Sequence, residues 1–135
     1  MSKPVPVPTT DTAHYWQACD GEELLYQRCG DCGHVQFYPR RSCVSCHGAN
    51  MTWLPSARRG VIHSFTIVHR PPTPSFDDDA PYVVALIDLD EGYRMMMNVV
   101  GDDRASSAIG RRVRVVFEER APGRKVPQAM LEAAP

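Results

Sequence analysis

The chain has 135 residues with 15 basic and 16 acidic side chains, so its formal net charge at pH 7 is −1. A charge this close to zero gives no global field that attracts nucleic acid or an anionic membrane surface. With 43% hydrophobic residues, this length predicts a globular protein of one domain, or of a small module joined to a slightly larger one.

Residues 1–20 predict a flexible arm followed by a short helix. The opening stretch MSKPVPVPTT has alternating prolines and lacks the apolar core of a signal peptide. No later apolar run approaches the ~18 residues that cross a bilayer, so we expect a cytoplasmic protein that does not enter membranes. Asp11 is expected to cap a helix that ends near Cys19, with Tyr15, Trp16 and Cys19 on one face.

Residues 21–50 predict a small metal-binding ribbon. Short strands are expected at Leu24–Gln27 and at Val35–Tyr38. The segment also holds two Cys-x-x-Cys pairs, which consist of Cys29, Cys32, Cys43 and Cys46. Four thiolates from two turns suit tetrahedral Zn²⁺ and leave no coordination position for water or substrate. We therefore expect a structural zinc site that helps a small segment to fold.

Other uses of these cysteines are weighed against zinc. Two disulfides suit a secreted protein, which the N-terminal sequence does not indicate. A thioredoxin-like redox pair requires a Cys-x-x-Cys at a helix N-terminus, a context that neither pair has. Iron bound by four thiolates would make an electron carrier and stays an alternative, although it leaves the second half of the chain unexplained. Cys19 lies outside the spacing and is expected to be a buried thiol.

Residues 51–120 predict a small barrel. Five segments are rich in β-branched and aromatic residues, namely Thr52–Leu54, Gly60–Val68, Tyr82–Leu89, Tyr93–Val100 and Arg112–Glu118. A turn at Asp90–Gly92 joins the third and fourth segments into a hairpin. Five short strands with one long loop suit a closed barrel of the OB type, which removes the sheet edges. Residues 121–135 are weakly patterned and are expected to form a C-terminal tail along the surface.

Three consecutive methionines, Met95–Met97, fall in the fourth of these segments. Because side chains alternate across a strand, one or two of them are expected to point inward. Core filling is the simpler interpretation of all three. An outward methionine could instead enter a partner interface, where its adaptable side chain is common.

The order of these motifs resembles a known family. The cysteine pairs are framed by Gln27-Arg28 and by Phe37-Tyr38-Pro39-Arg40, and Trp53, Gly60–His69 and Pro81–Gly92 follow. Over residues 12–118 this order resembles the acyl-CoA-associated OB-fold proteins with a rubredoxin-like zinc ribbon. The resemblance implies a mainly β fold with a short N-terminal helix, the zinc ribbon and a five-stranded OB-fold barrel. One departure is Arg58-Arg59-Gly60, where relatives usually have Gly-x-Gly; it is expected to lose a tight backbone and to add a cation.

The resemblance also implies a non-catalytic accessory subunit that binds or delivers acyl-CoA. The expected partner is a thiolase-fold acyltransferase or aldolase of lipid or steroid metabolism, or a MaoC-type hydratase, in a hetero-oligomer. No Ser/His/Asp or Cys/His arrangement has a recognisable context, so activity is expected of the complex and no catalytic residue is named. The alternative is a nucleic-acid-binding module, which requires a basic groove that this composition does not favour.

Contacts to CoA are hypothesised at arginines near strand ends and at two aromatic residues. CoA presents phosphates to neutralise and an adenine to stack on, and converging arginines could form one phosphate-binding patch. The candidate cations are Arg40, Arg41, Arg58, Arg59 and Arg70, and the candidate aromatic residues are Tyr38 and Trp16. The alternative is that these arginines are simply solvated at the strand ends.

Overall fold

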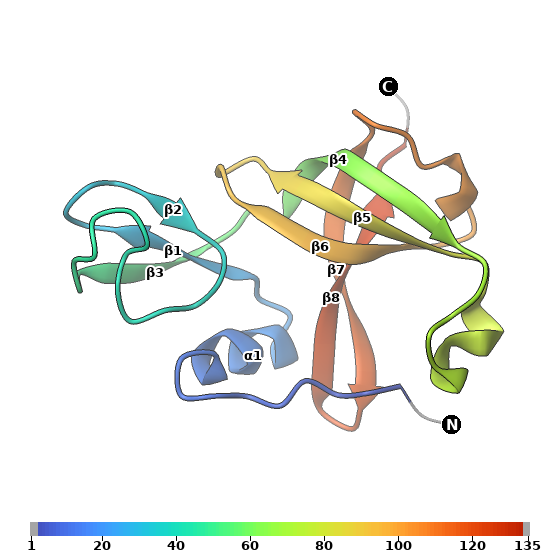
Figure 1. Cartoon of the computed structure of the whole chain (residues 1–135), viewed down its shortest axis with the longest axis horizontal. Coiled ribbons are helices and arrows are strands. Elements are labelled where there is room, and N and C mark those ends of the chain that lie inside the picture. The colour runs from blue at the N-terminus through green and yellow to red at the C-terminus, as the bar shows by residue number, and fades with distance from the viewer. Residues whose placement is uncertain (1–2, 134–135) are drawn as a thin grey trace.

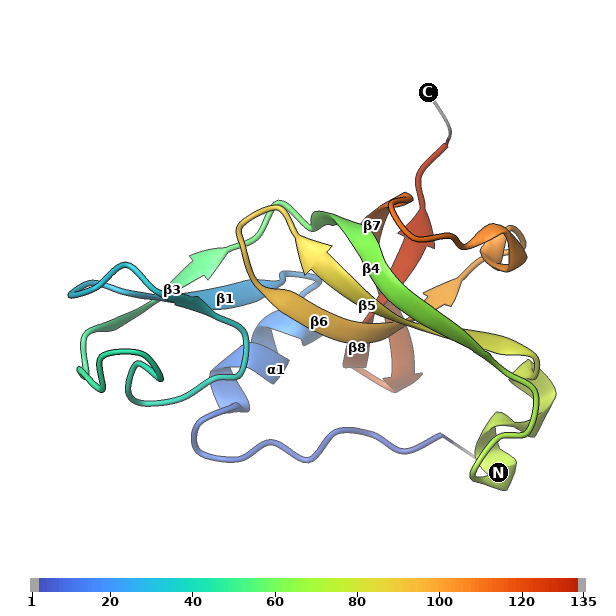
Figure 2. The same cartoon turned by 45° about the horizontal axis from the view of Figure 1, so that its top comes forward.

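The computed structural model describes residues 3–133 as a helix, a three-stranded ribbon sheet and a five-stranded closed barrel (Figure 1). In both views the ribbon sheet lies beside one end of the barrel, and the helix lies below the two (Figures 1 and 2). This mainly β architecture confirms the expected fold class. None of the helices in the described part of the chain is long and apolar enough to cross a membrane.

The helix α1 spans Ala13–Asp20 and presents the expected face to the core. Tyr15 and Cys19 are 2% and 0% exposed, respectively. The expected cap was wrong, because α1 begins two residues after Asp11 and no side chain caps it. The Asp11 carboxylate instead accepts a hydrogen bond from Arg41 Nε at 3.2 Å, which ties the start of the helix to the ribbon.

The ribbon sheet contains β1 (Leu25–Cys29), β2 (Val35–Gln36) and β3 (Met51–Pro55) in the antiparallel order β2-β1-β3. The segment expected to be the first barrel strand therefore belongs to the ribbon, which is a correction. It pairs with β1 along its whole length. Because β2 is only two residues long, β3 supplies most of the backbone partners that β1 needs.

The barrel strands follow the order β4-β5-β6-β8-β7, and β4 pairs with β7 to close the ring. The strands are β4 (Arg59–Val68), β5 (Tyr82–Leu89), β6 (Arg94–Val100), β7 (Arg112–Ala121) and β8 (Arg124–Leu131). Short 3-10 turns, η1 (Pro74–Asp79) and η2 (Arg104–Ser106), interrupt two loops. The hairpin predicted at Asp90–Gly92 is confirmed by the pairing of β5 with β6.

The expected C-terminal tail forms β8, so it does not lie along the surface. β8 pairs antiparallel with β7 over its length and briefly in parallel with β6. Ala129 and Leu131 are buried in the barrel core, and Val126 is buried on the side of β8 that lines a groove. The sequence hid this strand because Pro127 and Gln128 interrupt its apolar residues. The last two residues of the expected tail, and the first two of the expected arm, lie outside the described residues.

The N-terminal arm is extended, as expected, but it is docked on the protein surface (Figures 1 and 2). Lys3 forms ion pairs with Asp79 in η1 and with Glu118 in β7. Arg120 and Arg124 each donate a hydrogen bond to a proline carbonyl of the arm, at 3.3 and 3.0 Å. These contacts place the extended arm against the barrel, and its flexibility stays a prediction.

The step from the ribbon into the barrel keeps the tight backbone that a glycine would favour. Arg58 adopts a φ of 62°, in the left-handed region, so the expected loss of this geometry was wrong. The Arg58 guanidinium donates to the Glu22 carbonyl at 3.2 Å and lies over the Phe117 ring. At Gly60 a Cβ would meet the Asp88 carbonyl oxygen at 2.4 Å, so this glycine allows β4 and β5 to approach.

Candidate functional site

The four paired cysteines gather into one cluster at the end of the ribbon. Their Sγ atoms all lie within 4.8 Å of one another. The Sγ atoms of Cys29 and Cys46 are 3.6 Å apart, as are those of Cys32 and Cys43. Four thiolates around tetrahedral Zn²⁺ lie about 3.8 Å apart, given a Zn–S bond of about 2.3 Å. The cluster therefore fits one zinc ion, with no place for another protein ligand.

The backbone around the second pair stabilises a thiolate. The amides of Cys46 and Ser45 point at the Cys43 sulfur at 3.4 and 3.3 Å. These two N–H groups, the Cys46 amide first, lower the pKa of Cys43 to about 7. The Gly48 amide lowers the pKa of Cys46, but the nearby thiols of Cys29 and Cys32 raise it to about 12. Neighbouring thiols thus oppose full ionisation, and a divalent cation between them removes that penalty.

A buried pair of glutamines joins the two cysteine turns. Gln27 is 3% exposed, and its Oε1 accepts hydrogen bonds from the Arg40 amide at 3.0 Å and from Gln36 Nε2 at 2.9 Å. Gln27 Nε2 donates to the Arg40 carbonyl at 3.0 Å. Gln36 Oε1 accepts from the Val44 amide at 3.1 Å. The two side chains therefore set the path of the loop between the pairs.

Sequence reasoning missed this role for the glutamines, although a signal was present. Leu25, Gln27 and Cys29 alternate along β1 and all three are buried. A polar side chain on the buried face of a strand must be hydrogen-bonded. The position of Gln27 between Leu25 and Cys29 on that face therefore indicated a structural hydrogen bond.

The aromatic candidates Trp16 and Tyr38 line one apolar groove of about 350 Å³. The groove lies between α1, the ribbon loop, β6 and β8, and we call it the methionine groove. Its lining includes Trp16, Tyr38, Met96, Val126, Pro127 and Arg120. Tyr38 and Met96 are 71% and 70% exposed, whereas Met95 and Met97 are buried. The expectation that some of the three methionines point inward is therefore confirmed, and Met96 is the outward one.

The five candidate arginines do not converge into a single patch. Arg40 and Arg41 line a pocket of about 300 Å³ on the ribbon. Arg58 and Arg59 line a separate pocket at the start of β4. Arg70 comes two residues after β4, and the C-terminal end of β4 is far from the ribbon in both views (Figures 1 and 2). The expected single patch was therefore wrong, because the ribbon lies beside the barrel and does not fold over its far end.

Two of these arginines already have carboxylate partners. Arg59 donates hydrogen bonds to both Glu132 oxygens, at 2.8 and 2.9 Å, and thereby lowers the pKa of Glu132. Arg41 pairs with Asp11, but its side chain remains 78% exposed. The Arg40 and Arg41 pocket is thus the more accessible of the two arginine pockets for an anionic ligand.

Two family models match consecutive parts of this chain. The model described as "ChsH2, rubredoxin-like zinc ribbon domain" matches residues 16–52. The model described as "ChsH2, C-terminal OB-fold domain" matches residues 53–118. Together with the clustered sulfur atoms, the first match identifies this part of the chain as a zinc ribbon.

The relatives of this chain include a protein of similar length and a subunit that is much longer. A DUF35 domain-containing scaffold protein of Methanothermobacter thermautotrophicus is 35% identical over 112 residues, which are 82% of this chain and 84% of that protein. A probable enoyl-CoA hydratase alpha subunit of Thermomonospora curvata is 34% identical over 99 residues. Those residues are 73% of this chain but only 30% of that subunit, so this chain corresponds to a part of the longer protein.

A solved structure, described as an "Ltp2-ChsH2(DUF35) aldolase", matches this fold with a TM-score of 0.83. Its matching chain is 31% identical, and the match covers 93% of this chain and 98% of that one. The similarity therefore includes the ribbon and the barrel together.

Proposed function

Because this chain belongs to the DUF35 family of zinc-ribbon and OB-fold proteins, we propose that it is a non-catalytic accessory subunit of an acyl-CoA enzyme. The expected partner is a thiolase-fold acyltransferase or aldolase, or a hydratase of the MaoC type. The observation that carries this proposal is the match over 98% of a chain from an aldolase complex. A scaffold name on a relative of similar length supports the same role.

The geometry is also compatible with a scaffold. A zinc ion with four cysteine ligands has no open position for substrate, so the metal would support the ribbon and not a reaction. The ribbon loop presents Tyr38, and β6 presents Met96, as exposed large side chains. Exposed aromatic and methionine side chains are enriched where proteins bind one another.

Capture of the partner from the native host tests this role. The tagged full chain is purified from host lysate at moderate salt, and co-purifying proteins are identified by mass spectrometry. We expect a thiolase-fold enzyme or a hydratase in a fixed ratio to the chain, and we expect its activity to fall when the chain is removed. Recovery of nucleic acid, or of an enzyme whose activity is unchanged without the chain, would contradict the proposal.

We place the acyl-CoA contact in the pocket of Arg40 and Arg41. Two guanidinium groups can neutralise the CoA phosphates, and Trp53 in the same pocket offers an aromatic surface for the adenine. The other candidate cations are less suitable, because Arg59 is bound to Glu132 and Arg70 follows the end of β4 that is far from the ribbon (Figure 1).

Removing these two charges is expected to weaken acyl-CoA binding. We expect Arg40→Ala combined with Arg41→Ala to raise the Kd for acetyl-CoA by roughly a hundredfold or more, since two charge-assisted contacts of about 1.5–3 kcal/mol each are lost. Calorimetric titration of the full chain, alone and in its complex, measures the change. Arg70→Ala is the matched control and should bind as the unmodified chain does. If the double variant and this control bind acetyl-CoA with equal affinity, CoA does not bind in this pocket.

A further inference from the structure

The barrel has an open strand edge beside the methionine groove. β6 pairs with β5 along its length, but it meets β8 only at Val99 and Val100. Among the described residues, no strand pairs with the β8-facing edge of β6 from Arg94 to Met97. The far half of the β7–β8 hairpin extends away from β6 toward α1 in both views (Figures 1 and 2).

Met96 directs its backbone groups to this open edge. In an antiparallel strand, successive residues direct their N–H and C=O groups to opposite edges. The Asn98 amide points toward β8, because it donates to Gln128 Oε1 at 3.1 Å. Met96 has the same parity as Asn98, so its N–H and C=O also face the β8 side, where no described strand pairs with them. Its side chain is 70% exposed.

The opposing edge of β8 is blocked, so the two edges cannot simply close on each other. The Lys125 amide is occupied by the Asp20 carboxylate at 3.0 Å. Pro127, two residues later, has no N–H to donate. Natural edge strands are commonly protected by features of this kind. The edge at Met96 has neither a proline nor an amide that is bound by a described side chain.

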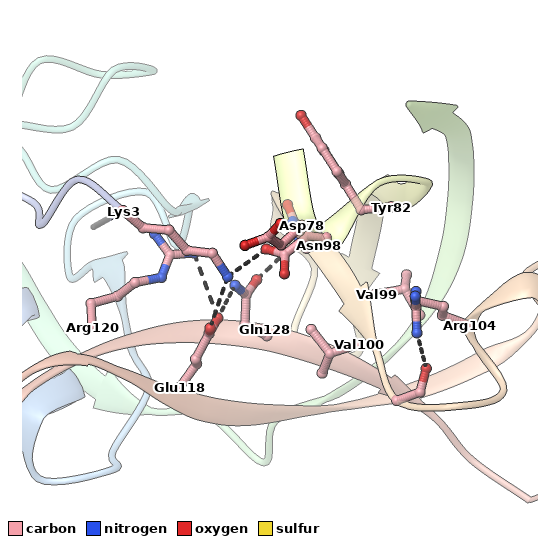
Figure 3. Close-up of a pocket in the computed structure, with 12 residues that line it drawn as sticks. Lys3, Asp78, Tyr82, Asn98, Val99, Val100, Arg104, Glu118, Arg120 and Gln128 are labelled. Atoms are coloured by element: carbon pink, nitrogen blue, oxygen red, sulfur yellow. Dashed lines mark hydrogen bonds and ion pairs between the residues drawn. The ribbon is translucent and has the colours of Figure 1, made fainter. Parts of the chain in front are cut away.

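Arg120 places a guanidinium group at one end of the groove. Within residues 3–133 it is the one charged residue that lines the methionine groove, and its side chain is only 12% exposed. Its Nε is buried and has no acceptor among the described residues. Figure 3 shows Arg120 beside Lys3, Glu118 and Gln128 in the adjoining polar pocket, which shares Asn98, Arg120 and Gln128 with the groove. Its other two nitrogens have partners, because one donates to the Pro4 carbonyl at 3.3 Å and the other lies 3.5 Å from a Glu118 carboxylate oxygen. Only Nε is therefore left without an acceptor at the edge of the groove.

We propose that the open edge of β6 binds an extended peptide from a partner protein as an added strand, with apolar side chains in the methionine groove and a carboxylate at Arg120. An extended peptide supplies both the N–H and the C=O that Met96 needs, whereas an acyl chain supplies neither. The carboxylate supplies the acceptor that Arg120 Nε lacks. This inference goes beyond the proposed function, since it does not require the partner to be an acyl-CoA enzyme.

Selection from a displayed library of random short peptides, with the full chain as bait, tests the proposal. We expect enriched peptides that alternate apolar residues and carry an acidic residue. They are then titrated against Met96→Pro and Met96→Thr. Both variants remove the methionine side chain, but only proline removes the edge N–H, and proline is tolerated where that N–H faces away from the sheet. Binding is expected to be roughly tenfold weaker to the proline variant than to the threonine variant.

Two further measurements keep the test decisive if the proline variant does not fold. Hydrogen exchange of the Met96 amide in the unmodified chain should slow when a selected peptide is bound. Exchanging the acidic residue of the peptide for its amide should weaken binding to the unmodified chain, but not to Arg120→Gln. These effects together identify strand addition and the contact to Arg120.

Several results would overturn the proposal. They are a selection with no enrichment over an unrelated bait, equal affinity of the two Met96 variants, and unchanged exchange of the Met96 amide. If the unmodified chain self-associates and Met96→Pro does not, the open edge binds a second copy of this chain and not a partner peptide. Because no enzyme partner enters these experiments, their failure is separate from failure of the accessory-subunit role.

Discussion

Replacing one cysteine from each pair, Cys29→Ser with Cys43→Ser, is expected to abolish zinc binding and to unfold the ribbon while the barrel stays folded. Structural zinc contributes about 10–16 kcal/mol to small zinc-binding segments. That is as large as the whole stability of a typical domain, about 5–15 kcal/mol. The ribbon sheet has three short strands, one of only two residues, so it has little else to replace the metal.

Metal analysis and hydrogen exchange measure this outcome. The unmodified chain should contain one zinc per molecule, and the double variant should contain almost none. Amides of the cysteine turns, such as Gly33 and His47, which bond to the Cys29 and Cys43 carbonyls at 2.9 Å, should lose their protection. Amides of β5 and β6 in the barrel should keep theirs.

The fifth cysteine provides the matched control. Cys19 is fully buried in α1 and lies outside the cluster, so Cys19→Ala should keep the full zinc content. A double variant that still holds one zinc per chain, or a ribbon that keeps its protected amides without metal, would show that the cluster does not fold this segment.

The zinc site could be predicted because its information is local in the sequence. Each pair of ligands lies within one turn, and the thiol chemistry restricts what such turns can hold. β4, β5, β6 and β7 were predictable for a similar reason, since each is a short run of β-branched, aromatic or other apolar residues bounded by turn residues. The sequence alone therefore indicated the ribbon and four of the five barrel strands.

The remaining features depend on contacts between distant segments. β8 contains Pro127, a residue that argues against a strand unless its missing N–H falls at an open edge. That edge exists only because β8 first pairs with β6 at Ala129, after Pro127 has passed. The arginine patch failed because it required a particular placement of the ribbon on the barrel, which no local pattern specifies. The docked arm likewise depends on Arg120 and Arg124, more than a hundred residues away in the chain.

Gln27→Leu is expected to destabilise the ribbon by roughly 2–4 kcal/mol, the second largest effect after loss of the metal. The substitution removes three hydrogen bonds to the side chain at once. Both backbone groups of Arg40 lose their partner, and the amide of Gln36 is left facing an apolar group at a buried site. Urea unfolding at saturating zinc, followed through ribbon amides, measures the difference.

A Gln-to-Leu substitution on the exposed face of α1 is the control, because it shows what the change to leucine does to stability where no hydrogen-bond network is lost. Gln17→Leu should leave the unfolding midpoint unchanged, since Gln17 is exposed and has no side-chain partner among the described contacts. Gln27→Leu combined with Gln36→Leu should cost less than the sum of the two single changes, because each glutamine is the other's partner. Additive costs would mean that the two side chains act separately. A network that couples them would instead fix the second cysteine turn against β1 before the metal binds, and would also position Arg40 in its pocket.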